Sequence, residues 1–311
     1  MNSDDITVSI RCTVYNHMQF LRQCLDGFII QKTSFRFNVF VHDDASTDGS
    51  DNIILEYARK YPDLIIPYIE KENLYSKRDG SFIRTTLNTK FLKGKYIALC
   101  EGDDYWTDPL KLQKQVDYME SHPECSMCFG NAIEHWEDGA IQDRAFSSLQ
   151  NRVYGAEELC RNWKVATATF LFRKDILNTE LYKRVQANKK MVAGDLPLVL
   201  TCAHFGSLYA FSDFFSVYRR HNSGFTINLN STRRTELGEF WEEIPHLFGQ
   251  SFTDDSLFYA IYHYRSGIKA AIKEGNLSRA RELYRRIILF YLLHPIAGLK
   301  RLIKIINEKH P

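Results

Sequence analysis

The chain has 311 residues, of which 44% are hydrophobic and 14% aromatic, enough for one large α/β domain with a smaller addition. Lys and Arg nearly balance Asp and Glu, and the formal net charge of +2 gives no reason to expect nucleic-acid binding. The longest apolar run, Ile287 to Leu293, is far shorter than the roughly 20 residues that span a bilayer. We therefore expect no transmembrane helix.

The cysteines and the N-terminus indicate a cytoplasmic protein. Seven cysteines, an odd number, lie mostly in apolar patterns, which predicts buried thiols in a reducing compartment. Cys125 and Cys128 have the spacing of a metal or redox pair, but no second pair exists and the apolar run around them favours a core strand. Met1 to Asp5 is polar and acidic, unlike a signal peptide.

Strand and helix patterns alternate through the first half, which predicts an α/β fold with a mostly parallel sheet flanked by helices. The expected strands are Thr7 to Tyr15, Phe37 to Val41, Leu64 to Ile69 and Tyr96 to Cys100. Helices are expected after Asn16, which is a candidate N-cap, over Ile53 to Tyr61, near Phe82 to Leu92, and after Asp108 and Pro109.

The second half is less regular. Ala166 to Arg173 and Phe214 to Arg219 are expected to be strands, Leu196 to His204 a short helix, and Asn222 to Thr232 a loop. From about Arg233 the pattern is wholly helical. We predict an α/β domain over residues 1–232 and an all-helical region over 233–311, in which Tyr259 to Ile288 resembles a single helix-turn-helix unit of the tetratricopeptide type.

Polar motifs follow three of the predicted strands, at Thr13 to Asn16, at Asp43 and Asp44, and at Glu101 to Asp104. In open α/β sheets, ligands bind in the crevice beyond the carboxyl ends of the strands. We therefore expect these three motifs to converge on one site.

The turn Glu101 to Asp104 places three carboxylates in four residues at the end of a buried strand. They repel one another unless solvent or a cation compensates. Mg²⁺ and Mn²⁺ prefer carboxylate oxygens and often share substrate phosphates. The alternative is a solvated acidic turn that caps the next helix. Tyr105 and Trp106 follow at once, and such aromatic residues suit a sugar-binding wall as well as they suit packing.

The pair Asp43 and Asp44 also has two interpretations. One is an Asx-type turn in which Ser46 or Asp48 caps the next helix. The other is a carboxylate that accepts a hydrogen bond from the N3–H of uracil, for which Asp44 is the better candidate.

These motifs together resemble family 2 glycosyltransferases with the GT-A fold. The resemblance covers roughly residues 6–225 and lies in four ordered motifs: Val8 to Ile10 with Thr13 to Asn16; Asp43 to Ser50; Gly94 to Ala98 with Glu101 to Trp106; and Gly194 and Asp195 with Tyr218 to His221. Two departures are visible. Glu101 replaces the usual Asp, so we assign it no metal role, and the usual Pro or Ala near the first motif is replaced around Arg11 to Val14.

The resemblance implies a nucleotide-sugar donor, which we expect to be UDP-linked, and a binding site built largely from residues of these motifs. It implies that Thr13, Tyr15 and Asp44 contact the base and ribose, with Asp103 near the ribose and Arg84 reaching the nucleotide or its phosphates. Trp106, as a wall of the sugar site, is a further candidate for substrate binding. Asp104 is implied as the main ligand of Mn²⁺ or Mg²⁺ and His221 as a second ligand.

The resemblance also implies that Asp195 is the general base that removes a proton from the acceptor hydroxyl, with inversion of the anomeric configuration. Each assignment has a structural alternative. Asp195 could cap the helix that begins at Leu196, and His221 could be a packed or surface histidine.

The last segment, Leu277 to Pro311, has eight Lys or Arg and two Glu, a local balance of +6, beside an apolar stripe of Leu299, Leu302, Ile303 and Ile306. Such a segment can lie in the interface of an anionic membrane, on its inner face in a cytoplasmic protein. The alternative is a basic solvated face on a helix packed against the catalytic domain.

The expected activity is transfer of a monosaccharide to a glycan or lipid-linked glycan acceptor in surface polysaccharide synthesis. A non-catalytic carbohydrate-binding or scaffolding relative is the first alternative, although all the expected carboxylates are present. A nucleotidyltransferase is the second, but Thr13 to His17 contains no glycine of a phosphate-binding loop.

Overall fold

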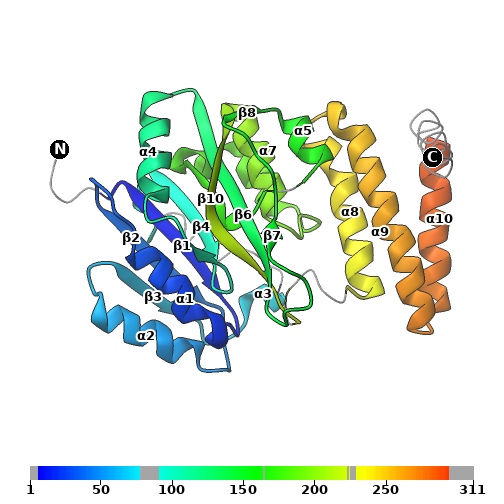
Figure 1. Ribbon diagram of the computed structural model, residues 1–311. Helices are drawn as coiled ribbons and strands as arrows, with labels where there is room; N and C mark the ends of the chain where they lie inside the picture. The colour runs from blue at the N-terminus through cyan, green and yellow to red at the C-terminus, as the bar shows by residue number, and fades with distance from the viewer. Residues whose placement is uncertain (1–5, 78–90, 164, 223, 225–228, 294–311) are drawn as a thin grey trace. The chain divides into compact units, whose positions relative to one another are not determined.

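The computed structural model describes residues 6–77, 91–163, 165–222, 224 and 229–293 (Figure 1). The chain forms two compact units, the first from residues 1–189 and 198–221, the second from residues 190–197 and 222–311. The sequence-based limits at 1–232 and 233–311 stay a prediction about the folding domains.

The first unit contains one large mixed sheet in which parallel pairs dominate the amino-terminal half. The strand order is β3-β2-β1-β4-β9-β6-β10-β5, with β7 beside β6 and β8 beside β10. β3, β2, β1 and β4 are parallel neighbours, β9 is antiparallel to both β4 and β6, and β6 is parallel to β10. The strands are β1 (Val8–Val14), β2 (Phe37–Asp43), β3 (Ile65–Ile69), β4 (Tyr96–Glu101), β5 (Tyr105–Trp106), β6 (Cys125–Trp136), β7 (Arg144–Ala145), β8 (Arg152–Tyr154), β9 (Leu171–Arg173) and β10 (Ser207–Arg220).

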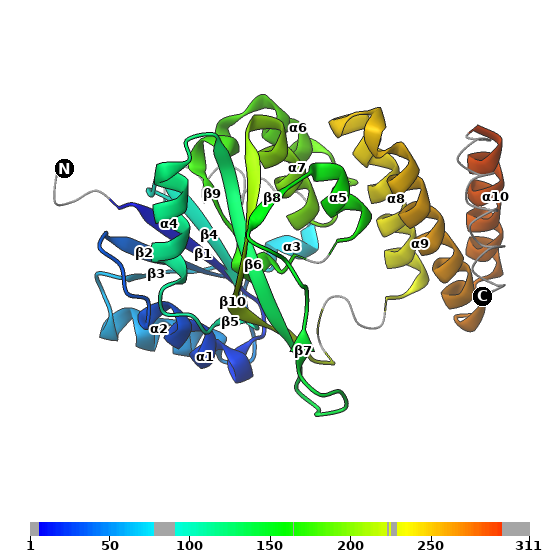
Figure 2. The ribbon, with the colours of Figure 1, turned by 45° about the horizontal axis from the view of Figure 1, so that its top comes forward.

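Helices cover both faces of this sheet, which is why its central strands are almost continuously buried (Figure 2). One face packs against α1 (Met18–Ile29), α2 (Ser50–Lys60) and α4 (Lys111–Ser121). The other packs against α5 (Ala156–Arg161), α6 (Glu180–Ala187) and α7 (Asp195–Phe205). The predicted α/β architecture with a mostly parallel sheet is confirmed, and Cys125 and Cys128 lie buried in β6, as a core strand requires.

Two local predictions were wrong. The predicted strand Ala166 to Arg173 begins with a 3₁₀ turn, η2 (Thr167–Thr169), and only Leu171–Arg173 is a strand. The hydroxyl and the amide of Thr169 both donate to the Ala166 carbonyl, at 2.7 and 2.9 Å, and this closes the turn.

The predicted helix near Phe82 to Leu92 falls largely outside the described residues.

The other wrong prediction concerns Asn16, which is not the N-cap of α1. Asn16 has a left-handed backbone conformation, with φ of 56°, and its side-chain oxygen accepts from the Thr47 amide at 2.8 Å. His17 occupies the position before α1 and makes no side-chain capping bond.

The second unit contains α8 (Ser231–Phe248), α9 (Thr253–Lys273) and α10 (Leu277–Leu293), with a 3₁₀ turn, η4 (Gln250–Phe252), between the first two. The predicted C-terminal helices are therefore confirmed. The Arg286 side chain ties α10 to α8 through an ion pair with Glu239 at 2.8 Å. No helix in the described part of the chain is long and apolar enough to cross a bilayer.

Glycine allows α8 and α9 to approach closely. A Cβ atom at Gly238 of α8 would lie 2.1 Å from Cε1 of Tyr264 in α9. The Tyr264 ring is fully buried, so it has no open space into which it could move. Gly238 lies within the α-helix α8. Glycine is therefore required at this position by packing and not by backbone conformation.

We predict that Gly238→Ala lowers the melting temperature. Helix propensity alone would make this change stabilising by about 1 kcal/mol, whereas overpacking against Tyr264 costs about 1–3 kcal/mol. Gly155→Ala, at the extended position before α5, controls for the added methyl group alone, because a Cβ atom there meets nothing within 4 Å. Thermal unfolding monitored by circular dichroism decides between the two effects, and a rise in melting temperature for Gly238→Ala would contradict the packing described here.

Candidate functional site

The carboxyl ends of β1, β2 and β4 lie side by side. Thr13 of β1 pairs with His42 of β2 and with Glu101 of β4. Beyond the strands, the Asp44 amide donates to the Val14 carbonyl and the Gly102 amide donates to the Thr13 carbonyl, both at 2.9 Å. The three polar motifs therefore converge at one edge of the sheet, as their positions after the strands predict.

Side chains of the second motif hold the loop that follows β1. The Asn16 amide donates to the Ser46 hydroxyl at 2.8 Å, and the Thr47 amide donates back to the Asn16 side chain at 2.8 Å. Because Asn tolerates the left-handed backbone region better than most residues, it suits this position. These reciprocal bonds fix the loop that carries Tyr15, whose ring is 47% exposed.

Asp48 supplies the N-terminal cap of α1 from a different loop. Its Oδ2 accepts from the Met18 amide, the first residue of α1, at 2.8 Å. Its Oδ1 accepts from both the amide and the hydroxyl of Ser50, at 3.0 and 2.7 Å. The Ser50 hydroxyl in turn accepts from the His17 amide at 3.0 Å. One carboxylate therefore joins the starts of α1 and α2.

Asp44 is buried, and its carboxylate binds backbone. Its two oxygens accept from the Leu74 and Tyr75 amides, at 2.7 and 3.0 Å, at the start of the short helix α3 (Leu74–Lys77). Asp43 accepts from the Ser46 amide at 3.1 Å, and burial raises the pKa of its carboxyl group. The contact of Asp44 with a nucleotide base stays a prediction, and the structure gives this carboxylate a capping role as well.

The acidic turn is tight. The Asp104 amide donates to the Glu101 carbonyl at 3.1 Å. A Cβ atom at Gly102 would lie 2.9 Å from Cγ2 of Val14 and 3.0 Å from Nδ1 of His17. Glycine at this position therefore lets the turn pack directly against the loop that follows β1.

The Asp104 side chain is only 3% exposed. Its Oδ1 accepts from the Arg219 amide at 2.9 Å, while the Arg219 guanidinium is bonded to Glu137 and Gln23. Burial raises the pKa of Asp104 well above its usual range, and the negative charges of Asp103 and Glu101 raise it further. A bound cation would relieve this accumulation of negative charge.

Asp103 has different surroundings. Nε2 of His221 lies 3.1 Å from its Oδ2 and Nε2 of His17 lies 3.6 Å from the same oxygen. Burial alone would raise the pKa of Asp103, but the His221 hydrogen bond and the two imidazoles hold it below its usual value. Burial lowers the pKa of His17. Among the described residues, His17 Nδ1 has no hydrogen-bond partner.

These residues suit an ion that is held by few protein ligands. In the described part of the chain, no group of three or more His, Cys, Asp or Glu is arranged to hold a metal ion. Mg²⁺ sites commonly use one or two carboxylates together with substrate phosphates and water, so the Asp104 carboxylate fits such a site. His221 already uses its Nε2 with Asp103, and its role as a second ligand stays a prediction.

A family model identifies the family to which the sequence belongs. The model of the family described as "Glycosyl transferase family 2" matches residues 9–180, which is more than half of the chain. The chain belongs to glycosyl transferase family 2.

Individual family relatives are similar over most of the chain. An uncharacterized protein of Mycobacterium tuberculosis is 34% identical over 259 residues, 83% of this chain and 70% of the relative. TuaG of Bacillus subtilis, a putative teichuronic acid biosynthesis glycosyltransferase, is 20% identical over 71% of this chain and 82% of its own length.

Solved structures share the fold. S. aureus TarS 1-349 in complex with UDP-GlcNAc has a TM-score of 0.58 at 13% identity, covering 90% of this chain and 92% of that one. The mannosyltransferase PcManGT from Pyrobaculum calidifontis, in complex with GDP-Man and Mn²⁺, has a TM-score of 0.51 at 16% identity, with coverage of 94% and 84%.

The structure changes the interpretation of Trp106 in this glycosyltransferase. The side chain is 1% exposed, and its indole N–H donates to the Ala168 carbonyl at 2.7 Å. The buried Lys111 ammonium lies 3.9 Å from the centre of the ring, and Phe28 packs against it edge-on. Because the ring is enclosed, the expected sugar-binding wall is corrected to a packing role.

Two predicted site residues remain, Asp195 and Arg84. Asp195 is the first residue of α7 and belongs to the second unit. Its carboxylate accepts from the Leu196 amide at 2.8 Å, a local bond at the start of the helix, and its role as a base stays a prediction. Arg84 lies outside the described residues.

We predict that Asp48→Ala lowers the free energy of unfolding by about 1–3 kcal/mol, because the variant loses the cap of α1 and leaves amides without an acceptor. Asp51→Ala is the control: it removes a carboxylate from the first turn of α2, where its recorded hydrogen bond is with the neighbouring Asn52 side chain. Urea denaturation of both variants tests this. Equal stability losses would mean that Asp48 has no special structural role.

Proposed function

We propose that this glycosyltransferase moves a monosaccharide from a UDP-sugar to a glycan or lipid-linked glycan acceptor in surface polysaccharide synthesis, with inversion at the anomeric carbon. The observation that carries the proposal is the buried Asp104 carboxyl group beside Asp103 and Glu101, at the edge where three strands end. The names of two similar proteins support the substrate classes: TarS has been crystallised with UDP-GlcNAc, and TuaG is named for teichuronic acid biosynthesis.

The donor nucleotide would lie across the ends of β1, β2 and β4. Thr13 and the exposed ring of Tyr15 would contact the base and ribose, and Asp44 would accept from the base. Asp103 would accept from a ribose hydroxyl. The two histidines on its Oδ2 orient this carboxylate and favour its ionised form.

Asp104 would hold a divalent ion, Mn²⁺ or Mg²⁺, and His221 is the candidate for a second ligand. When bound, such an ion stabilises negative charge on a diphosphate leaving group. The Arg219 amide orients Asp104 through its Oδ1. Because the Arg219 guanidinium is engaged by Glu137 and Gln23, it does not compete for the carboxylate as a salt-bridge partner.

The chemical step needs a base for the acceptor hydroxyl, and we assign that role to Asp195. A carboxylate that removes this proton allows the oxygen to attack the anomeric carbon directly, from the face opposite the leaving group, and this inverts the configuration. Asp195 also has its local bond to the Leu196 amide, which restrains the carboxylate at the start of α7.

We predict that the protein releases nucleoside diphosphate from a nucleotide sugar in the presence of Mn²⁺, and that Asp104→Asn lowers this rate by about 10²-fold or more. Asp117→Asn, which changes an exposed carboxylate on α4, should behave like the wild type. A panel of UDP- and GDP-sugars identifies the donor. Release of pyrophosphate would instead indicate a nucleotidyltransferase, and binding without any turnover would indicate a carbohydrate-binding relative.

We predict that Asp195→Asn lowers the rate of transfer by about 10²–10⁴-fold, the contribution typical of a general base, and leaves the dissociation constant of the donor unchanged. Donor affinity is measured by calorimetry and transfer by product analysis on a glycan acceptor. If the variant transferred sugar at the wild-type rate, the base would have to be another residue.

A further inference from the structure

The helix α10 has two apolar sides. Ala280, Leu283 and Ile287 are buried and pack the helix into the second unit. Six other large apolar side chains of the helix are between 44% and 71% exposed: Leu277, Tyr284, Ile288, Leu289, Leu292 and Leu293. A helix that only packs against its neighbours needs one apolar stripe, so this second set requires another explanation.

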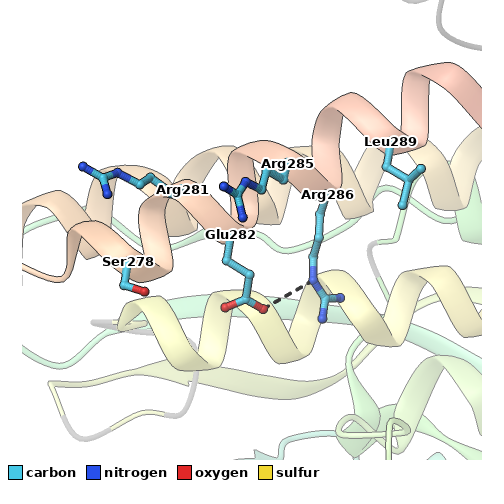
Figure 3. Close-up of a pocket in the computed structure, with 6 residues that line it drawn as sticks. All are labelled: Ser278, Arg281, Glu282, Arg285, Arg286 and Leu289. Atoms are coloured by element: carbon cyan, nitrogen blue, oxygen red, sulfur yellow. Dashed lines mark ion pairs between the residues drawn. The ribbon is translucent and has the colours of Figure 1, made fainter.

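Basic side chains accompany the exposed apolar ones. Arg281 and Arg285 line a surface pocket of about 600 Å³ together with Leu289 (Figure 3). Within the described part of the chain, neither arginine forms an ion pair. Arg286, by contrast, is paired with Glu239 of α8. Arg281 and Arg285 therefore retain a positive charge that no described residue neutralises through an ion pair.

One carboxylate, Glu282, also lines this pocket. It lies 3.8 Å from Arg279 and 3.6 Å from Arg286. These contacts offset its charge, so the exposed side of α10 carries a net positive charge. We call the set Arg281, Tyr284, Arg285, Ile288, Leu289, Leu292 and Leu293 the α10 face.

We propose that the α10 face docks on the surface of an anionic lipid bilayer. Apolar side chains beside arginines are the composition of helices that lie in the membrane interface, where the apolar groups enter the acyl boundary and the cations meet lipid phosphates. A second copy of the chain fits less well, because two positively charged faces would repel each other. The proposal goes beyond the transfer reaction and does not depend on it.

The test is vesicle flotation of the full chain. We expect binding to phosphatidylcholine vesicles that contain phosphatidylglycerol, weaker binding as salt is added, and little binding to phosphatidylcholine alone. The variant Arg281→Gln/Arg285→Gln should bind about thirtyfold more weakly, because each arginine near an anionic surface contributes roughly 1 kcal/mol. The control Arg59→Gln/Lys60→Gln removes the same charge from exposed residues of α2 and should bind like the wild type.

The apolar contribution has its own matched pair. Leu292→Glu should weaken binding about tenfold or more, since it removes an inserted side chain and adds a negative charge. Leu55→Glu makes the same change at an exposed leucine of α2 and should have little effect. Circular dichroism checks that both variants are folded.

The proposal would be overturned if the α10 variants and the α2 variants bound vesicles equally, or if the wild type bound neutral and anionic vesicles equally. It would also be overturned if the wild type did not bind vesicles but self-associated, and Leu292→Glu abolished that self-association. Release of nucleoside diphosphate from a soluble donor should be unchanged in Arg281→Gln/Arg285→Gln. Loss of vesicle binding with retained donor turnover therefore separates this proposal from the proposed function.

Discussion

The Asp104 carboxyl group is the point on which the site depends. It is buried at the end of β4, next to two other acidic residues, and it accepts a hydrogen bond from the Arg219 amide of β10. Burial of like charges is unfavourable unless something compensates. In this protein the buried like charges lie at the edge of the sheet where we propose that a phosphate-bearing substrate and its ion bind.

Neighbouring elements keep that carboxylate in place. Gly102 allows the turn to pack on Val14 and His17, and Asp48 and Asn16 join the loops after β1 and β2. Asp103 differs from Asp104 although the two are adjacent, because two histidines lower its pKa while burial raises that of Asp104. Neighbouring acids can therefore take different roles in one turn.

Much of the fold could be predicted from the sequence, because strands buried on both faces appear as continuous apolar runs. The convergence of Thr13, Asp44 and Asp104 followed from their positions at the carboxyl ends of predicted strands. Two of the predictions that failed depended on contacts distant in sequence. Asn16 resembles a local cap, but its partner is Thr47, and Trp106 resembles a sugar platform until Lys111 and Phe28 are seen to enclose it. His17 had no signal of its own, since its contact with Asp103 appears only when the first and third motifs meet.

The most direct test of the account is calorimetric titration of UDP into the protein with Mn²⁺ and with a chelator. We predict that Mn²⁺ strengthens UDP binding to the wild-type protein, and that Asp104→Asn removes this gain without abolishing the weaker binding seen with the chelator. Equal UDP affinity with and without Mn²⁺ in the wild type, or an unchanged gain in Asp104→Asn, would contradict the assignment of the acidic turn as the metal and nucleotide site.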